Sequence, residues 1–332
     1  MRNFIYYLEY LGAKVLAWEV RILPRAFLPV MARWMEICFR LARPYRKLIR
    51  ANISAAMPEL APPEVERISR ESMRNTFWNF LEFVWMNGSM KRLQRCCQYP
   101  PDPELKKMTL GYHHAGRRMI FINPHLGSWE ASGMMVTMFG NLDMAAIAKP
   151  IKNPYVNRLL NSGSREKAHG LKIIFSRGAA REAIKLMKQG MHLGTLIDQN
   201  TRVRDGGEFL EFFGLPVASS VSPAVIKRYC DAHGIPAVII LGATLRRPDG
   251  ILHPVCLELP RPFEEYPDDR AVIQEAMKMS ESLIRKYPEQ YLWLYKRFQH
   301  IPPDCPEELR KRYPYYAKVP SPNFFRKLRP RS

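Results

Sequence analysis

The spacing of hydrophobic and polar residues changes character near residue 100 of this chain. Before that point, apolar positions recur with helical spacing. In residues 31–42 the charged side chains recur every three or four positions, from Arg33 to Arg43, and leave one narrow polar stripe on an otherwise apolar helix. Residues 4–22 are similar and add tyrosines and a tryptophan, which favour the level of lipid headgroups. Residues 1–100 are therefore predicted to be a helical, membrane-associating region, with a helical cap on a soluble core as the alternative.

Beyond residue 100, strand-like and helical patterns alternate. Short apolar runs predict strands at residues 118–122, 144–148, 172–175, 192–197, 237–245 and 254–259. Helical patterns fall at residues 128–139, 154–168, 178–188, 219–232 and 270–286. This alternation predicts an α/β fold in which helices flank a central, mostly parallel sheet. We assign residues 101–300 to this domain and residues 301–332 to a basic, proline-rich tail. The part after Glu308 is expected to be a solvated, loosely ordered arm that could also dock on anionic lipid.

The charge balance restricts the partners of the protein. The net charge of +20 calls for an anionic partner: nucleic acid, an anionic membrane face, or an acidic protein or substrate. No signature of a nucleic-acid-binding fold is present, so nucleic acid is not expected. No secretory signal is visible, and no segment reaches about 18 apolar residues without a charge. Peripheral or monotopic attachment is the expectation, and a short or tilted spanning helix stays open.

The most specific chemical pattern lies in residues 121–130. An apolar strand is followed at once by His125 and then by Ser128, which can open a helix that carries Glu130. Since each helical residue turns about 100°, His125 and Glu130 would diverge by about 140° on one helix. They can converge only if His125 lies on the turn before the helix. An imidazole there can accept a proton from an attacking hydroxyl, while a carboxylate fixes its tautomer.

Ser128 is the predicted N-cap of that helix, beside N–H groups that suit an oxyanion or a phosphate. Asp198 and Gln199 follow the next clear strand. Because the carboxyl ends of parallel strands meet at one edge of a sheet, Asp198 can face His125. A charged residue that only caps its strand is the alternative.

Other candidates have weaker patterns. Arg165 stands among other surface cations, and its spacing alone indicates a solvated charge. Phe212, Phe213 and Gly214 form an aromatic loop that can line an apolar ligand site, although core packing explains it equally well. The six cysteines lack metal-ligand spacing, and no phosphate-binding or dinucleotide-binding glycine motif is present, so neither a metal nor a cofactor is expected.

Together these residues resemble the lysophospholipid acyltransferase superfamily, whose hallmark is a histidine followed five positions later by an acid. His125 and Glu130 match it, with Glu in place of the commoner Asp. Within the superfamily, the chain is similar to the bacterial lipid A biosynthesis acyltransferases, the lauroyl and myristoyl transferases. The further matches are residues 50–58, Asn153-Pro154, Arg165 with Gly170, Asp198-Gln199, residues 212–214 and, above all, residues 288–298.

The resemblance implies transfer of a fatty acyl chain from a thioester, on acyl carrier protein or coenzyme A, to a hydroxyl of a glycolipid such as a lipid A precursor. It implies a single displacement with His125 as general base, oriented by Glu130, Asp198 or both. Arg165 would bind a phosphate or steady developing charge, while Ser128, Gln199 and the 212–214 loop would contact substrate. The implied location is the cytoplasmic face of the bacterial inner membrane.

Three alternatives stay open from the sequence. The protein can be a catalytically silent membrane-surface binding protein of the same fold. It can act on another glycolipid, a phospholipid or an aminolipid acceptor. It can also be a hydrolase that uses the same histidine.

Overall fold

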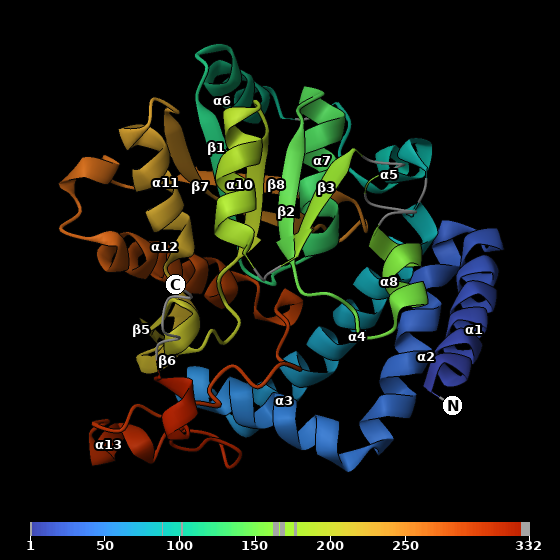
Figure 1. Cartoon of the computed structure of the whole chain (residues 1–332). Helices are drawn as coiled ribbons and strands as arrows, with labels where there is room; N and C mark the ends of the chain where they lie inside the picture. Colours follow the sequence, from blue (N-terminus) through green and yellow to red (C-terminus); the bar gives the residue numbers. More distant parts are fainter. Residues whose placement is uncertain are drawn as a thin grey trace.

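Helices occupy the N-terminal part of the chain, as the spacing of its apolar residues predicts. The computed structural model describes residues 2–87, 89–100, 102–161, 166, 170–175 and 178–326. The helices before the first strand are α1 (Arg2–Ile22), η1 (Arg25–Phe27), α2 (Leu28–Leu41), α3 (Arg43–Ala56), α4 (Pro62–Met86), α5 (Met90–Cys96) and α6 (Pro103–His114) (Figure 1). Proline occupies the first turn of α2, α3, α4 and α6, where its missing N–H costs no helical hydrogen bond.

A six-stranded sheet forms the centre of the second part of the chain. Its strands are β1 (Arg118–Asn123), β2 (Met144–Ala148), β3 (Leu171–Phe175), β4 (His192–Leu196), β7 (Ala237–Arg246) and β8 (Leu252–Glu258). Their order is β3-β2-β4-β1-β7-β8, and every pair is parallel except β7 with β8. The predicted α/β class with a mostly parallel sheet is confirmed.

Helices cover both faces of this sheet (Figure 1). They are α7 (Trp129–Gly140), α10 (Ala179–Lys188), α11 (Ser222–Ala232) and α12 (Asp269–Lys286), whereas α8 (Pro154–Leu160) packs against α1. One group of contacts joins α10, α11 and α12, and another joins α6 and α7. The predicted helix at residues 154–168 begins as expected at Pro154, but residues 162–165 and 167–169 lie outside the described part of the chain.

The register of β1 against β4 brings the two chemical candidates to one edge of the sheet. Asn123, the last residue of β1, pairs with Leu196, the last residue of β4. His125 and Asp198 each follow two residues later. Both residues therefore lie just beyond the ends of adjacent strands at the same edge of the sheet, as the parallel arrangement predicts.

Sequence reasoning missed a two-stranded hairpin formed by β5 (Gly207–Phe212) and β6 (Leu215–Ser220). Its turn consists of Phe213 and Gly214, both with positive φ, as a tight two-residue hairpin turn requires. A phenylalanine rarely adopts this conformation, so the turn was not visible as one. The predicted helix start at Ser219 was wrong, because β6 continues to Ser220 and α11 begins at Ser222.

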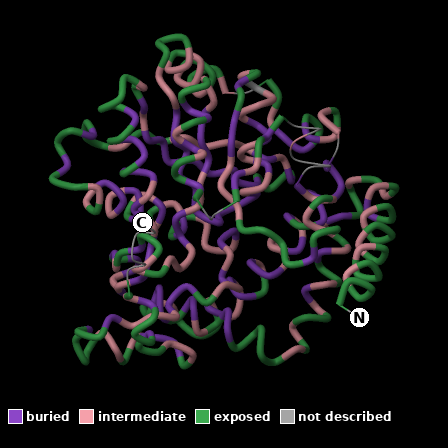
Figure 2. The backbone as a smooth tube through the Cα atoms, viewed as in Figure 1, coloured by how far each residue is buried: buried purple, intermediate pink, exposed green. Residues whose placement is uncertain are grey.

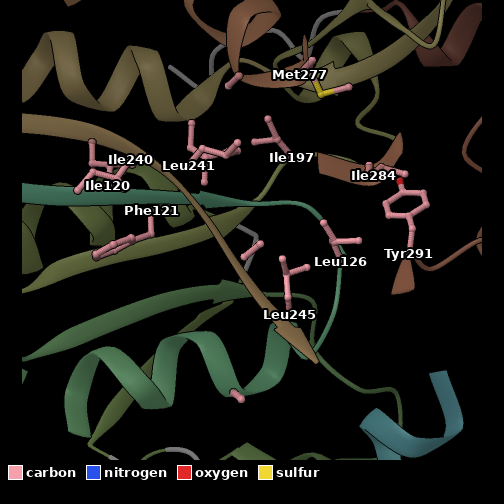
Figure 3. Close-up of a cluster of buried hydrophobic side chains, with 14 of the residues drawn as sticks. Ile120, Phe121, Leu126, Ile197, Ile240, Leu241, Leu245, Met277, Ile284 and Tyr291 are labelled. Atoms are coloured by element: carbon pink, nitrogen blue, oxygen red, sulfur yellow. The ribbon is translucent and has the colours of Figure 1, made fainter. Parts of the chain in front are cut away.

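One hydrophobic core joins the N-terminal helices to the sheet. Buried side chains from α1, α2, α3 and α4 belong to the same cluster as those of the central strands. The strands are mostly buried, whereas α1 is exposed along most of its length (Figure 2). Leu126 and Ile197, which adjoin His125 and Asp198, lie in this core together with Tyr291 (Figure 3). The two loops that carry the chemical candidates are therefore anchored by apolar packing next to the polar side chains.

The C-terminal segment is packed rather than extended into solvent as far as residue 326. The Arg312 guanidinium donates to the carbonyls of Phe213, 2.9 Å away, and of Ala55, 3.3 Å away. The Tyr313 hydroxyl donates to the Pro216 carbonyl at 2.6 Å. The expectation of a solvated arm is wrong for residues 309–326, because Arg312 and Tyr313 satisfy hydrogen-bonding groups of α3 and the hairpin. Residues 327–332 lie outside the described part of the chain.

Within the described residues, no helix combines the length and the apolar character needed to cross a membrane.

Candidate active site

A histidine and an aspartate form a buried pair at the carboxyl edge of the sheet. The Nδ1 atom of His125 lies 2.6 Å from Oδ1 of Asp198, and the backbone N–H of His125 donates to Oδ2 of the same carboxylate at 2.8 Å. His125 is 7% exposed and Asp198 is 2% exposed. One carboxylate therefore fixes both the ring and the backbone of the histidine, which defines the direction of the opposite ring nitrogen, Nε2.

The surroundings of Asp198 favour its ionised form. Burial raises the pKa of this carboxyl, but electrostatic attraction to His125, the two hydrogen bonds from His125 and the nearby Arg297 outweigh burial and hold the pKa below its usual value. An ionised carboxylate only accepts hydrogen bonds. The His125 proton that faces Asp198 must therefore be on Nδ1.

The Nε2 face of His125 meets polar and aromatic groups. The side-chain amide nitrogen of Gln199 lies 3.0 Å from Nε2. The indole of Trp129, in the first turn of α7, lies with its ring centre 5.2 Å from that of His125. An amide nitrogen carries only donors, so it must face a lone pair on Nε2. The geometry thus describes a neutral imidazole with its proton on Nδ1 and its basic nitrogen on the Gln199 side.

The backbone of residues 123–128, here called the His125 loop, is held by hydrogen bonds from several elements. Gly127 N–H donates to the Gln290 carbonyl at 3.0 Å, and the His125 carbonyl accepts from Leu292 N–H at 3.0 Å. The Asn79 amide of α4 donates to the Gly127 carbonyl at 2.7 Å. These partners come from distant parts of the sequence, so the loop conformation depends on the assembled fold.

Asn79 is itself positioned by a buried ion pair. Its Oδ1 accepts from Arg246 at 2.8 Å, and Arg246 pairs with the carboxylate of Glu82 at 2.6 Å. Arg25, in the connection between α1 and α2, bonds the other oxygen of Glu82 at 2.9 Å. Since Glu82 is fully buried, both arginines are needed to satisfy its charge. The network links the N-terminal helices to the His125 loop.

Residues 288–298, here called the C-terminal strap, run beneath the His125 loop. The Gln290 side chain exchanges two hydrogen bonds with the backbone of Arg246, at 2.8 and 2.9 Å. Burial and then the neighbouring charge of Asp198 raise the pKa of Tyr291 well above its usual value, so the phenol stays neutral beside the carboxylate. The strap therefore supports both members of the His125–Asp198 pair.

The strap is in turn anchored to α3 and the hairpin. The Asn52 amide of α3 donates to the carbonyls of Trp293, at 2.6 Å, and Tyr295, at 2.8 Å. The buried Arg297 guanidinium donates to the carbonyl of Ala218 at 3.0 Å and to the hydroxyl of Ser219. The motif at residues 288–298 thus serves mainly to position the site, a role that its sequence alone did not indicate.

Two further candidates from the sequence are the acid Glu130 and the base Arg165. Glu130 lies in the first turn of α7, half-buried, with His125 before the helix as predicted. Both ring nitrogens of His125 already face Asp198 and Gln199, so Asp198 is the acid that orients the ring in this geometry. Arg165 lies outside the described residues.

Ser128 occupies the N-cap position of α7, but its side chain does not cap the helix. Its hydroxyl is buried and has no hydrogen-bond partner among the described residues, while its backbone N–H donates to the Thr244 carbonyl at 2.7 Å. A buried hydroxyl without a partner is costly unless a bound group satisfies it. This hydroxyl therefore has hydrogen-bonding capacity that no described residue uses.

The Phe212-Phe213-Gly214 segment is part of the core beneath the strap. Phe212 and Phe213 are at most 1% exposed, and their rings contact Tyr291 and Trp293 respectively. The Gly214 carbonyl lies 3.5 Å from the Arg312 guanidinium. Packing accounts for this segment, and its role in substrate binding stays a prediction.

An apolar cavity lies beside the site, between α6, α7 and strands β1, β7 and β8. Its volume is about 60 Å³, several times the roughly 10–15 Å³ that holds one water molecule. The lining residues are mostly apolar or glycine and include Phe121, Gly133, Met135, Val136, Leu142, Met144, Gly242, Ala243, Val255 and Cys256. Two of its polar side chains, Ser132 and Thr244, are hydrogen-bonded to each other at 2.8 Å. The cavity therefore suits an apolar ligand rather than water.

The residues that line the cavity extend along α7. They include Asn123, at the end of β1, and Ser132, in the first turns of α7, and also Gly140, at the end of α7, and Met144, at the start of β2. Gly140 lies eight positions after Ser132, which is about 12 Å along the axis of α7.

A histidine–carboxylate pair next to an apolar channel is compatible with several kinds of acyl chemistry, and comparison with known families decides between them. The sequence profile described as bacterial lipid A biosynthesis acyltransferase matches residues 1–300. This chain belongs to that family. It is an acyltransferase, as the resemblance predicts.

Individual members of the family align over most of their length. Lipid A biosynthesis acyltransferase 2 of Shigella flexneri is 23% identical over 276 residues, covering 81% of this chain and 82% of that protein. Lipid A biosynthesis myristoyltransferase of Escherichia coli (strain K12) is 22% identical over 300 residues, covering 88% and 86%. Lipid A biosynthesis lauroyltransferase of the same organism is 22% identical over 315 residues, covering 91% and 94%.

Sequence reasoning gave no positioning role to three residues that support the His125 loop or the strap, although two of them lie in the matched segments 50–58 and 288–298. Asn79, Asn52 and Arg297 are all buried polar side chains that bond backbone carbonyls far away in sequence. A buried asparagine inside an amphipathic helix was the available signal for the first two, because such a group needs a partner. The identity of that partner required the fold.

A substitution at Gly127 tests whether the His125 loop of the acyltransferase needs its observed backbone. Gly127 has φ of +62°, and a Cβ there would lie 2.0 Å from the carbonyl oxygen of Thr244. Gly127→Ala must therefore shift the loop, and activity is expected to fall by about 10²-fold, because displacements of about 1 Å have effects of this size. The measurement is initial acyl-transfer rate together with the unfolding temperature.

Gly116→Ala is the matched control. Gly116 also has positive φ, at +72°, but a Cβ at this position would meet no atom of the described residues within 4 Å, its chain neighbours aside. This variant adds the same backbone strain without a clash and should keep most of its activity. Equal activities of the two variants would contradict the need for the observed backbone conformation at Gly127.

Proposed function

We propose that this protein transfers a fatty acyl chain from an acyl thioester to a hydroxyl of a lipid A precursor. The thioester is carried on acyl carrier protein or coenzyme A. The observation that carries the proposal is the His125–Asp198 pair, 2.6 Å apart, at the sheet edge beside an apolar cavity. The curated relatives are named for lipid A biosynthesis and for lauroyl and myristoyl transfer, which supports this donor and acceptor.

The proposed reaction is a single displacement. Nε2 of His125 takes the proton of the acceptor hydroxyl as its oxygen attacks the thioester carbonyl. The C–S bond then breaks, and the thiolate leaves with the proton from the imidazolium. The Asp198 carboxylate holds Nδ1–H and stabilises the positive ring that forms in between. The neutral tautomer described above is the one that this step requires.

Three further residues belong to the same proposal. The buried hydroxyl of Ser128, at the start of α7, which has no partner among the described residues, would donate to the developing oxyanion. Glu130, also in the first turn of α7, would orient the acceptor rather than His125, because Asp198 already holds the ring. Arg165 keeps its predicted role of binding a phosphate.

The apolar cavity is the proposed site of the donor's acyl chain. Its lining includes Asn123, two residues before His125, so a carbonyl at the first carbon would lie near Nε2. Gly140 and Met144 also line the cavity and would face the far end of the chain. The side chains along α7 would then determine how many methylenes enter.

We further propose attachment to an anionic membrane face through α1 and α2. Apolar side chains on α1 recur every three or four residues along one stripe and are all at least 40% exposed: Phe4, Leu8, Leu11, Val15, Trp18 and Ile22. Trp34 and Leu41 of α2 are 66% and 78% exposed. Such stripes are typical of helices that lie in a lipid interface. Each lysine or arginine near the surface adds about 1 kcal/mol, which favours the cytoplasmic face of the inner membrane.

Replacement of the proposed base is the direct test of the reaction. General-base catalysis typically contributes about 10²–10⁴ in rate, so His125→Ala should lower turnover by that factor while the protein stays folded. The assay follows the acylated lipid A precursor by mass spectrometry, with unfolding temperature as the check on folding. Near-wild-type turnover of the folded variant would remove His125 from the mechanism, and absence of any acylated product from the native protein would refute acyl transfer to this acceptor.

Two substitutions at Val136 test the proposed acyl-chain site in opposite directions. Val136 lines the cavity about midway along α7. Val136→Phe should shift donor preference toward shorter chains, and Val136→Ala toward longer ones. Each excluded methylene loses about 0.8 kcal/mol, so a shift of two methylenes changes relative rates by roughly tenfold. Rates with a series of acyl thioesters measure this, and identical chain-length profiles for all three proteins would place the chain elsewhere.

A charge on the exposed stripe tests membrane attachment. Leu11→Asp places a carboxylate on the apolar stripe of α1, whereas Asn3→Asp adds the same charge at an exposed polar position of that helix. Sedimentation with phosphatidylglycerol vesicles should show at least tenfold weaker binding for Leu11→Asp, because a buried leucine contributes roughly 1.5–3 kcal/mol. The Asn3→Asp variant should bind nearly as the native protein does. Equal binding by both variants would show that α1 does not contact the lipid through this stripe.

A further inference from the structure

Gln199 occupies the one atom of His125 that the proposed reaction needs. Its amide nitrogen lies 3.0 Å from Nε2 of His125, on the side opposite Asp198. The ring has a single lone pair on Nε2, and it lies in the ring plane. An acceptor hydroxyl must donate its proton to the same lone pair. Gln199 and the acceptor therefore compete for Nε2.

The residues on both sides of Gln199 are held by hydrogen bonds, while its own side chain is partly exposed. Asp198 is held by His125 through two hydrogen bonds. Asn200 donates from its backbone to the Tyr295 hydroxyl at 3.0 Å and from its side chain to the Lys296 carbonyl at 2.9 Å. Gln199 itself is only half-buried. Displacement of its amide from Nε2 thus requires side-chain rotation alone and leaves the His125–Asp198 pair in place.

We propose that Gln199 determines specificity for transfer over hydrolysis by capping His125 until the acceptor displaces it. This inference rests on the proposed role of His125 as general base. Water could otherwise use the same base: its oxygen would attack the thioester carbonyl, its proton would go to Nε2, and the C–S bond would break to give a fatty acid and a free thiol. The amide on Nε2 disfavours this route.

The acceptor overcomes the cap because it binds elsewhere as well. A glycolipid has many contacts remote from the reacting hydroxyl, and binding energy from such contacts can drive displacement at the reacting centre. A water molecule has no such contacts. The cap therefore slows hydrolysis in the absence of acceptor but does not slow transfer once acceptor is saturating. Substitution of this one side chain should therefore change the rate of hydrolysis without changing the maximal rate of transfer.

Gln199→Ala is the test, with Gln189→Ala as matched control. Gln189 is an exposed glutamine at the end of α10, remote in the chain from the site. A neutral hydrogen bond contributes a factor of roughly 2- to 12-fold to an equilibrium. Gln199→Ala should raise hydrolysis of an acyl thioester without acceptor by that factor. With acceptor present, kcat for transfer should change little and KM for the acceptor should fall by a similar factor. Gln189→Ala should match the native protein in each assay.

A second variant separates the hydrogen bond from simple space filling. Gln199→Met keeps an unbranched side chain of similar length without an N–H donor, so it should also raise hydrolysis, by less than Gln199→Ala. Unfolding temperatures establish that both variants are folded. An unchanged ratio of transfer to hydrolysis in both folded variants overturns the inference. So does an equal loss of both activities, which would indicate a structural role.

His125→Ala distinguishes failure of this inference from failure of the proposed function. If His125 is the base, the double variant His125→Ala/Gln199→Ala should hydrolyse thioester no faster than His125→Ala alone. Increased hydrolysis that persists in the double variant would mean that Gln199 acts without His125, and the capping role would be refuted. Full activity of His125→Ala itself would instead refute the proposed function on which the inference rests.

Discussion

The buried carboxylate of Asp198 is the group on which the site depends. It binds the ring and the backbone of His125 at the same time, at 2.6 and 2.8 Å, and it does so from the neighbouring strand of a parallel sheet. A buried charge of this kind is tolerated only where it is fully paired. His125 and Arg297 supply that pairing, and Tyr291 lies beside it. The groups around this one carboxylate come from the sheet edge and the strap, and Arg297 links the strap to the hairpin.

The C-terminal strap connects the His125–Asp198 pair to distant elements of the fold. It contacts the His125 loop through Gln290 and Leu292, β7 through the Gln290 side chain, and α3 through Asn52. Backbone polar groups in loops need partners when they are buried. Here the partners of one loop come from helices and strands on several sides, so the histidine has little freedom to move. Gln199, by contrast, adjoins Nε2 with a side chain that can turn without disturbing these bonds.

The sequence predicted the class of fold and the edge of the sheet where His125 and Asp198 meet, because both follow from local patterns. The apolar run before His125 and the one before Asp198 indicated parallel strands, and parallel strands end together. The hairpin at residues 207–220 was missed because its turn uses Phe213 in a conformation that phenylalanine rarely adopts. The positions of Asn79 and Arg297 were also beyond reach, since their partners are backbone carbonyls that no side-chain pattern reveals. The acid that holds His125 was left open between Glu130 and Asp198, and only the assembled geometry separates them.

The distance in sequence between the His125 loop and the strap has a consequence for biosynthesis of the chain. The ribosome completes residues 123–128 more than 160 residues before it reaches Leu292, whose N–H binds the His125 carbonyl. Until then, the loop lacks its hydrogen bonds to Gln290 and Leu292, and Asp198 lacks its neighbour Tyr291. With the proposed attachment through α1, a nascent chain that already exposes its apolar stripe would reach a lipid surface before the His125 loop has its hydrogen bonds to the strap. Attachment would then precede completion of the proposed site.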